Sequence, residues 1–306
     1  MIYTVTLNPS IDYLVEVENF QMGSVNRTTN DRKFPGGKGI NVSRVLKRIG
    51  NDTTAFGFIG GQTGEFVKTF LNQEEIMTDF TEASGDTRIN IKLKTGIETE
   101  INSQGPDISI ESYQQLVKKM DDLKAEDLLV LSGSIPASLP KDVYSELTKK
   151  CSEKGIKVVV DTSGKELLNV VPYQPFLVKP NHHELAELFS TEINHVDDAC
   201  KYGMKLVEMG AQHVIVSMAG DGAVLCTKNK AYSANVPKGN VVNSVGAGDS
   251  MVAGFIGSYE TTKNILSAFH YSLAAGSATA FSADLCSLDA IEELLPQIAI
   301  TELTGS

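Results

Sequence analysis

The segment NSVGAGDSMVAG, residues 243–254, places a carboxylate directly after a turn of small residues. Gly246, Ala247 and Gly248 lead into the pattern of a helix start, where unpaired backbone N–H groups and the helix dipole attract an anion. The next residue, Asp249, is itself an anion. It is either an N-cap that satisfies those N–H groups or a base that works beside a bound phosphate. The segment alone leaves both interpretations open.

A second glycine-rich segment, PGGKGIN at residues 35–41, lies near the N-terminus. Gly36 and Gly37 allow the backbone to approach a ligand closely. Lys38 and Asn41 add a cation and an amide. A loop that only turns the chain would have the same composition, so this segment does not by itself decide between a ligand site and a turn.

The elements that must position these residues alternate between two patterns. Short, nearly continuous apolar runs predict buried strands, and amphipathic patterns such as residues 41–50 and 64–73 predict helices between them. This alternation is typical of a parallel sheet covered on both faces, in which ligands bind beyond the carboxyl ends of the strands. The expected strands lie within residues 2–7, 53–61, 127–134, 156–161, 176–181 and 213–218.

Residues 87–103, TRINIKLKTGIETEINS, break this alternation. Apolar and polar residues alternate from Ile89 to Lys94, and a Thr-Gly turn precedes a second strand, which predicts a β-hairpin. Residues 13–20 are a candidate third strand of the same small sheet. We expect this sheet to be a lid or a dimerisation flap on the large domain.

Composition excludes several classes of function. The chain has 306 residues, 42% of them hydrophobic, and a formal net charge of −11, which argues against nucleic acid as a partner. An anionic substrate must therefore be attracted by a local basic cluster. The sequence has no G-x-x-x-x-G-K-[ST] motif, so a P-loop is excluded.

The cysteines and the N-terminus point to the cytoplasm. Four cysteines without a C-x-x-C pair favour reduced thiols over disulfides or a zinc site. The N-terminus lacks a basic stretch followed by an apolar one, so we expect no signal peptide, and no apolar run is long enough to suggest a membrane span.

Together, the two glycine-rich segments resemble the two signatures of the ribokinase-like, phosphofructokinase B family of sugar kinases. TLNPSID, GFIGGQTGEF, SGSIP, KPNHHEL and AAGSAT also occur in the family's order, so the resemblance covers the whole chain. It implies one domain over residues 1–306 with a three-layer α/β/α fold, a mainly parallel central sheet and lid strands within residues 13–34 and 87–103. FPGGKGINVSRVL and TRINIKLK are most similar to the branch that acts on phosphorylated ketohexoses.

The resemblance implies that Asp249 is the base for the substrate hydroxyl. The N–H groups of Gly246, Ala247 and Gly248 would hold the γ-phosphoryl group of ATP. The base and the donors have to be neighbours, because the alcohol loses its proton as charge spreads over the phosphoryl oxygens. This requirement favours the base interpretation over the N-cap.

The resemblance also implies a nucleotide and magnesium site. Asn181 and Glu184 have the spacing of a capping box, yet in the family this N-x-x-E element positions Mg²⁺, and both roles are compatible because Mg²⁺ keeps several waters. The family often uses a monovalent cation such as K⁺, but FSADL at residues 281–285 departs from the expected loop, so a K⁺ requirement does not follow. The expected ATP-binding residues are Lys179, Asn181, Ser217, Gly220, Gly222, Ser244, Val245 and Ser277.

At the sugar end, Asp12 matches the family's acceptor for sugar hydroxyls. Arg27 and Arg88 match positions that hold the substrate's own phosphate, a task that suits bidentate guanidinium groups, although each basic residue alone would more often be a solvated surface charge. The remaining expected substrate-binding residues are Gly36, Gly37, Lys38, Asn41 and Asn90. Lys92 is a further basic residue on an element that can face the sugar.

The expected reaction is ATP-dependent phosphorylation of D-fructose 1-phosphate to D-fructose 1,6-bisphosphate by a cytoplasmic homodimer that pairs through the lid. The nearest alternative is a kinase for D-tagatose 6-phosphate. A kinase for an unphosphorylated sugar would leave Arg27, Lys38 and Arg88 without a task. A non-catalytic sugar-phosphate sensor would be expected to lack the base, and Asp249 is present.

Overall fold

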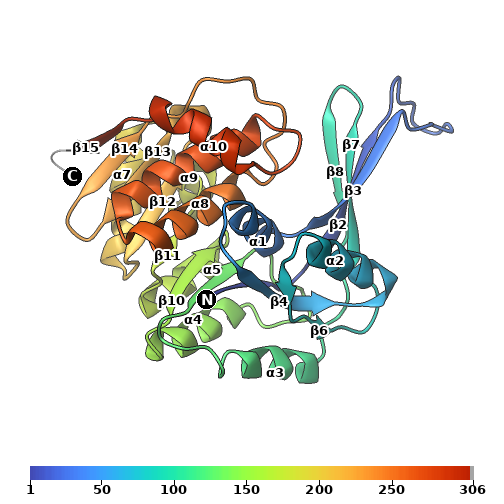
Figure 1. Cartoon of the computed structure of the whole chain (residues 1–306), viewed down its shortest axis with the longest axis horizontal. Coiled ribbons are helices and arrows are strands. Elements are labelled where there is room, and N and C mark those ends of the chain that lie inside the picture. Colours follow the sequence, from blue (N-terminus) through green and yellow to red (C-terminus); the bar gives the residue numbers. More distant parts are fainter. Residues whose placement is uncertain (304–306) are drawn as a thin grey trace.

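A mainly parallel sheet runs through the middle of the molecule in the computed structural model, which describes residues 1–303 (Figure 1). The parallel strands follow one another in the order β12 (His213–Ser217), β11 (Leu177–Val178), β10 (Lys157–Asp161), β9 (Leu128–Ser132), β1 (Ile2–Thr6), β4 (Thr53–Ile59) and β5 (Met77–Thr78). The short strand β6 (Thr81–Glu82) pairs with β4 outside this order.

Antiparallel strands extend the sheet beyond β12. They are β13 (Ala223–Thr227), β14 (Ala231–Ala234) and β15 (Ile300–Leu303). A 3₁₀ turn at Ala219–Asp221 joins β12 to β13. Strand β11 is shorter than expected because Pro180 follows it closely, and proline has no N–H for the sheet ladder.

Helices cover both faces of this sheet, as the alternation predicted. One face packs against α3 (Ile110–Lys119), α4 (Val143–Glu153), α5 (Lys165–Val170), α6 (His182–Phe189) and α7 (Val196–Glu208). The other packs against α1 (Lys38–Arg48), α8 (Ala247–Thr262), α9 (Ile265–Ala280) and α10 (Leu288–Leu294). Short 3₁₀ turns follow α5 at Val171–Tyr173 and α10 at Leu295–Gln297. The three-layer α/β/α arrangement is confirmed.

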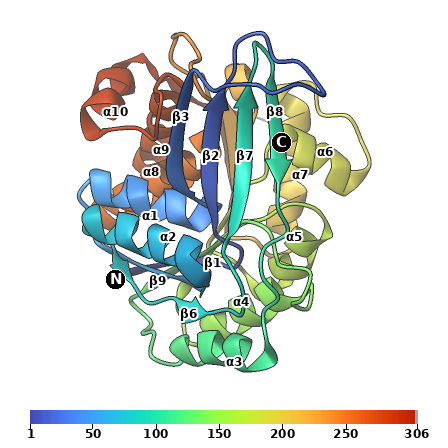
Figure 2. The ribbon, with the colours of Figure 1, turned by 90° about the vertical axis from the view of Figure 1, so that its right-hand side faces the viewer.

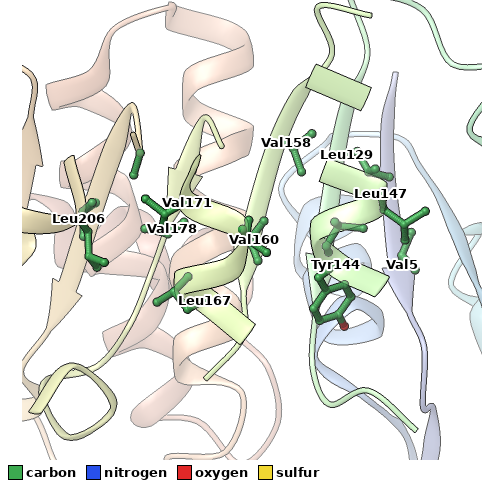
Figure 3. Close-up of a cluster of buried hydrophobic side chains, with 14 of the residues drawn as sticks. Val5, Leu129, Tyr144, Leu147, Val158, Val160, Leu167, Val171, Val178 and Leu206 are labelled. Atoms are coloured by element: carbon green, nitrogen blue, oxygen red, sulfur yellow. The ribbon is translucent and has the colours of Figure 1, made fainter. Parts of the chain in front are cut away.

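The apolar runs of the strands are continuous because the side chains on both faces of each strand pack into a hydrophobic core. In β9, Leu129 faces the cluster around α4 and α7, whereas Leu128 and Val130 face the cluster around α8 and α9. Figure 3 shows the first cluster, in which Leu129 and Val160 lie among side chains from the neighbouring helices. Burial on both faces fixes the strand register and therefore the positions of the loops at the strand ends.

A second, four-stranded sheet stands apart from the first (Figure 2). The order of this sheet, which we call the lid sheet, is β3 (Asn30–Gly36), β2 (Ser10–Glu16), β7 (Arg88–Lys94) and β8 (Glu98–Asn102). Helix α2 (Gly61–Gln73) contacts β2 and β3. The hairpin expected within residues 87–103 is confirmed as β7 and β8, but β2 begins before residue 13 and β3 ends after residue 34.

Within residues 1–303, no helix is both long enough and apolar enough to cross a membrane.

Candidate active site

A cavity of about 660 Å³ opens between the lid sheet and the carboxyl ends of the parallel strands, where ligands were expected. We call it the main cavity. It brings together residues that are far apart in the sequence. Those that the sequence analysis had singled out are Asp12, Gly37, Lys38, Asn41, Arg88, Asn90, Lys92, Lys179, Asn181, Glu184, Ser217, Val245, Gly246, Gly248 and Asp249.

Asp249 lies in the first turn of α8 and is buried. Its carboxylate accepts a hydrogen bond from Asn41 Nδ2 at 2.8 Å. The two glycine-rich segments therefore meet, because Asn41 is the last residue of segment 35–41 and Asp249 belongs to segment 243–254. The hydrogen bond orients the Asp249 carboxylate within the main cavity.

The environment of Asp249 raises the pKa of this carboxyl to about 6. Burial is the largest cause, and the nearby carboxylate of Asp161 adds to it, while Lys38, Asn41 and Lys179 act in the opposite direction. A carboxylate with a pKa near neutrality can accept a proton and is still mostly ionised at pH 7.

The turn before α8 keeps backbone donors open toward the main cavity. Gly246 has φ 79°, a left-handed conformation that glycine adopts easily. The Ala247 N–H donates to the Ser244 carbonyl at 3.2 Å, and Ala247 does not line the cavity, so its role as a donor to the phosphoryl group stays a prediction. Gly246 and Gly248 do line it, so they are the members of the turn that face the main cavity.

Two lysines and an aspartate form a charged cluster beside this turn. Lys38 Nζ lies 3.4 Å from Asp161 Oδ2, and Lys179 Nζ lies 3.6 Å from Asp161 Oδ1. The charge of Asp161 is the main reason that the pKa of Lys38 is raised. The sequence analysis did not single out Asp161, although its position at the end of a buried strand was a signal.

Asn181 and Glu184 form the capping box that their spacing indicated. Asn181 Oδ1 accepts from the Glu184 N–H, and Glu184 Oε2 accepts from the Asn181 N–H, each at 2.8 Å. Both side chains also line the main cavity. His183 is exposed and His182 partly so, and their rings lie together on α6.

Magnesium fits this corner of the cavity. The capping box uses one oxygen of the Glu184 carboxylate, and one carboxylate together with substrate phosphates and waters is a common donor set for Mg²⁺. Among residues 1–303, no group of three or more His, Cys, Asp or Glu side chains forms a closed metal cage. Glu184 and Asn181 would therefore support the ion rather than enclose it.

Polar side chains of the lid form the opposite wall of the main cavity. Asp12 Oδ1 accepts from Ser10 Oγ at 2.8 Å and from Asn90 Nδ2 at 3.1 Å. The strand register places Asp12 beside Asn90, so both face the cavity. Gly36 lies against the Asp12 carboxyl, where a Cβ would collide with it. The wall offers acceptors and an amide to a hydroxylated ligand.

Arg88 and Lys92 supply positive charge on the same wall. The Arg88 guanidinium donates to the Asn8 carbonyl at 3.0 and 3.2 Å and to the Ser103 carbonyl at 3.1 Å. These bonds hold the base of β7 against the start of β2 and the end of β8. Lys92 pairs with Glu100 at 2.6 Å. Both basic groups are thus already oriented by the protein.

Several expected site residues do not line the main cavity. Arg27 is exposed in the loop between β2 and β3. Gly220 lies in an open surface turn, and Gly222 packs against the Ala234 carbonyl. The other expected site residues that do not line the main cavity are Ala247, Ser244, Ser277 and Gly36. The structure adds cavity residues that the sequence analysis missed: Thr6, Asn8, Ser10, Asn102, Gly133, Ser134 and Asp161.

A buried carboxylate beside an open helix N-terminus, facing a polar lid across a cavity, suits the transfer of a phosphoryl group to a hydroxylated ligand. The sequence matches the pfkB family carbohydrate kinases over residues 5–290, and the chain belongs to this family. Kinases of this kind transfer a phosphoryl group from ATP with the help of a divalent cation.

The proteins to which this chain is similar include several kinases of phosphorylated sugars. The chain is 54% identical to a 1-phosphofructokinase of Bacillus subtilis, over 99% of this chain and 100% of that one. It is 39% identical to a D-tagatose-1-phosphate kinase of Bacillus licheniformis, over 99% and 100%. Phosphofructokinase-2 from Escherichia coli in complex with potassium has a TM-score of 0.92 at 29% identity, over 97% and 98%. A tetrameric inhibited form of that enzyme has a TM-score of 0.90 at 30% identity, with the same coverage.

Proposed function

We propose that this protein transfers the γ-phosphoryl group of ATP to D-fructose 1-phosphate and forms D-fructose 1,6-bisphosphate. The observation that carries this proposal is the buried Asp249 beside the open turn at Gly246 and Gly248, across the main cavity from Asp12 and Arg88. The 54% identity to a 1-phosphofructokinase over almost the whole chain supports the choice of substrate.

In the proposed reaction, Asp249 accepts the proton of the attacking sugar hydroxyl, and Asn41 keeps its carboxylate oriented. The N–H groups of the turn hold the oxygens of the transferring group, and the ammonium groups of Lys38 and Lys179 stabilise its charge. Asp12 and Asn90 form hydrogen bonds with the sugar hydroxyls. The bond from the γ-phosphorus to the bridging oxygen of ATP breaks as the bond to the sugar oxygen forms.

Magnesium is the divalent cation that we propose, with Glu184 and Asn181 as the residues that would support it. When bound, Mg²⁺ neutralises the charge of the nucleotide phosphates. Val245 and Ser217 line the same cavity and are the proposed nucleotide contacts that the geometry supports best. We place the reaction in the cytoplasm, which supplies ATP and keeps the four buried cysteines reduced.

The substrate's own phosphate would bind to positive charge at the sugar end. Arg88 and Lys92 face the main cavity from the lid, where the chain's overall negative charge would otherwise repel a sugar phosphate. The relative that acts on D-tagatose 1-phosphate favours a second candidate substrate. D-Tagatose 1-phosphate also carries its phosphate on carbon 1 and differs from D-fructose 1-phosphate only in the configuration at carbon 4, so Arg88 would serve either sugar.

The experiment is an assay of ADP formation with D-fructose 1-phosphate, D-fructose 6-phosphate, both tagatose phosphates and free fructose. We expect D-fructose 1-phosphate to have the highest kcat/KM. A charge-assisted contact contributes about 1.5–3 kcal/mol, so Arg88→Ala should lower kcat/KM for this substrate by roughly 10–150-fold and leave the slow reaction of free fructose nearly unchanged.

Arg32→Ala is the matched control, because Arg32 is an exposed arginine of the same lid sheet that does not line the main cavity. Its kcat/KM should equal that of the wild type. Equal losses with the phosphorylated and the free sugar in Arg88→Ala would mean that Arg88 only shapes the lid. A wild-type preference for a sugar without phosphate would reject the substrate assignment.

We also propose that two copies pair through the outer face of the lid. Ile89, Ile91 and Ile101 lie on the face opposite Asp12 and Asn90, according to the strand register. Ile89 is 40% exposed and Ile101 is 55% exposed, which is unusual for apolar side chains on neighbouring strands. An apolar face of this kind fits a second copy of the same sheet.

A further inference from the structure

Asp161 is an almost fully buried charge in the wall of the main cavity, and its side chain is only 1% exposed. It is the last residue of β10, a central strand of the parallel sheet, and pairs in register with Ser132 of β9. Its backbone is therefore held against β9, and its carbonyl accepts a hydrogen bond from the Gly133 N–H at 3.1 Å. The proposed reaction assigns no task to this carboxylate.

The Asp161 carboxylate is unusual because its partners are ion pairs and not hydrogen-bond donors. Neither of its oxygens has a hydrogen-bond donor within residues 1–303. Two ammonium groups instead lie at ion-pair distances of 3.4 and 3.6 Å, which are long for hydrogen bonds. Burial alone would raise the pKa of Asp161, but the charges of Lys179 and Lys38 outweigh it and the pKa is lowered. Asp161 is therefore ionised and balances two cations.

Both lysines also lie within electrostatic reach of the proposed base. Lys38 and Lys179 act on Asp249 as well as on Asp161. Lys179 lies against the start of α8, since a Cβ at Gly248 would be 3.2 Å from its Nζ. Without the charge of Asp161, Asp249 and Glu184 would be the carboxylates left for Lys38 to pair with.

We infer that Asp161 is a positioning residue that holds the ammonium groups of Lys38 and Lys179 beside the turn at 246–248 and keeps them from pairing with Asp249. This inference rests on the proposed function, in which that turn receives the phosphoryl group. An ammonium group paired with Asp249 would make the Asp249 carboxylate a weaker base. The same ammonium group would then no longer stabilise the charge of the phosphoryl oxygens. Asp161 thus keeps the base and the cations separate.

The test compares Asp161→Asn, which keeps the shape and removes the charge, with Asp127→Asn. Asp127 is a matched control because it is also buried and pairs with an ammonium group, the N-terminus at 3.0 Å, but lies outside the main cavity. The pKa of the Asp249 carboxyl is measured in each protein by NMR titration without substrate. The pH profile of kcat is measured alongside.

In Asp161→Asn we expect the pKa of Asp249 to fall by about one unit or more, because a nearby negative charge is lost and the lysines are free to approach. The acid limb of the kcat profile should move to lower pH, and the plateau of kcat should fall by about tenfold or more. Asp127→Asn should leave the pKa of Asp249 and the kcat profile unchanged. An unchanged pKa, or an unchanged kcat plateau, in folded Asp161→Asn would overturn the inference.

A second comparison covers the case in which Asp161→Asn does not fold because it leaves Lys179 buried without a partner. Asp161→Asn is then made in a Lys179→Met background and compared with Lys179→Met alone, where the same downward shift of the Asp249 pKa is expected. The titration uses no sugar. If the wild type does not phosphorylate D-fructose 1-phosphate, the proposed function is rejected. The titration still tests the inference about Asp161 in that case.

Discussion

Glu184 illustrates how one side chain serves both the fold and the site. It completes the capping box of α6 and lines the main cavity. A glutamine at this position can still accept the hydrogen bond from the Asn181 N–H, so Glu184→Gln separates the two roles. The cap survives this substitution, whereas the negative charge that would support Mg²⁺ is removed.

We expect Glu184→Gln to raise the Mg²⁺ concentration for half-maximal activity by roughly tenfold or more, with little change in Tm or in the KM for the sugar. Glu187→Gln, on the exposed side of the same helix, should leave the Mg²⁺ titration unchanged. A lower Tm combined with a wild-type Mg²⁺ titration would show that Glu184 is only a cap.

At the scale of single residues, the sequence predicted those parts of the site that lie within local motifs. Asp249 and Asn41 follow small-residue turns, and the structure brings them within 2.8 Å. Asp161 and Asn102 belong to no such motif. Their place in the cavity depends on which strands are neighbours and how they are registered, which a single sequence does not encode locally.

The lid is the element whose movement the reaction would need. Its inner face and the loop between α9 and α10 enclose a narrow space of about 70 Å³, lined by Lys94 and Glu98 on one side and by Ala283 and Asp284 on the other. Phosphoryl transfer to an alcohol must exclude water, since water would otherwise hydrolyse ATP. The hairpin β7–β8 is therefore expected to close over the sugar.

Replacing Thr95–Ile97, the hairpin tip, by Asn-Gly should raise the KM for D-fructose 1-phosphate several-fold and increase ATP hydrolysis without sugar, because closure is impaired. Sedimentation should show an unchanged mass. Ile101→Asp, on the outer face, should instead produce monomers. Wild-type kinetics together with a changed mass in the shortened hairpin would assign the tip to dimerisation and not to the site.

Element prediction succeeded where burial imposes a pattern. The central strands and the hairpin were expected because their side chains face apolar cores or alternate. Strand β3, sequence NDRKFPG, was not separately expected, since three consecutive residues, Asp31, Arg32 and Lys33, are exposed and charged and no apolar alternation marks the strand. Its place in the sheet depends on pairing with β2.

At the scale of the whole molecule, the site depends on contacts between distant parts of the chain. Arg44 is almost completely buried in α1 and pairs with Glu74, after α2, at 2.8 Å and with Asp284 at 3.1 Å. Arg48 pairs with the same two carboxylates. This cluster joins the helix that carries Lys38 and Asn41 to the loop that faces the lid. The α/β class was predictable, but this junction was not.

The central claim is that Asp249 accepts a proton while the turn before α8 holds the phosphoryl group. The most direct measurement is kcat with ATP and D-fructose 1-phosphate, as a function of pH, for the wild type and Asp249→Asn. The base must be ionised to act, so the wild-type rate should fall as pH drops through the pKa of Asp249, about 6 in the free protein.

Asp249→Asn should lower kcat by about 10²–10⁴-fold and still bind ATP, because it keeps the local shape and loses only the base. Asp127→Asn, which removes a buried carboxylate outside the cavity, should keep both the rate and the acid limb. An Asp249→Asn enzyme that retains more than about a tenth of the wild-type kcat would contradict the account and return Asp249 to a structural role.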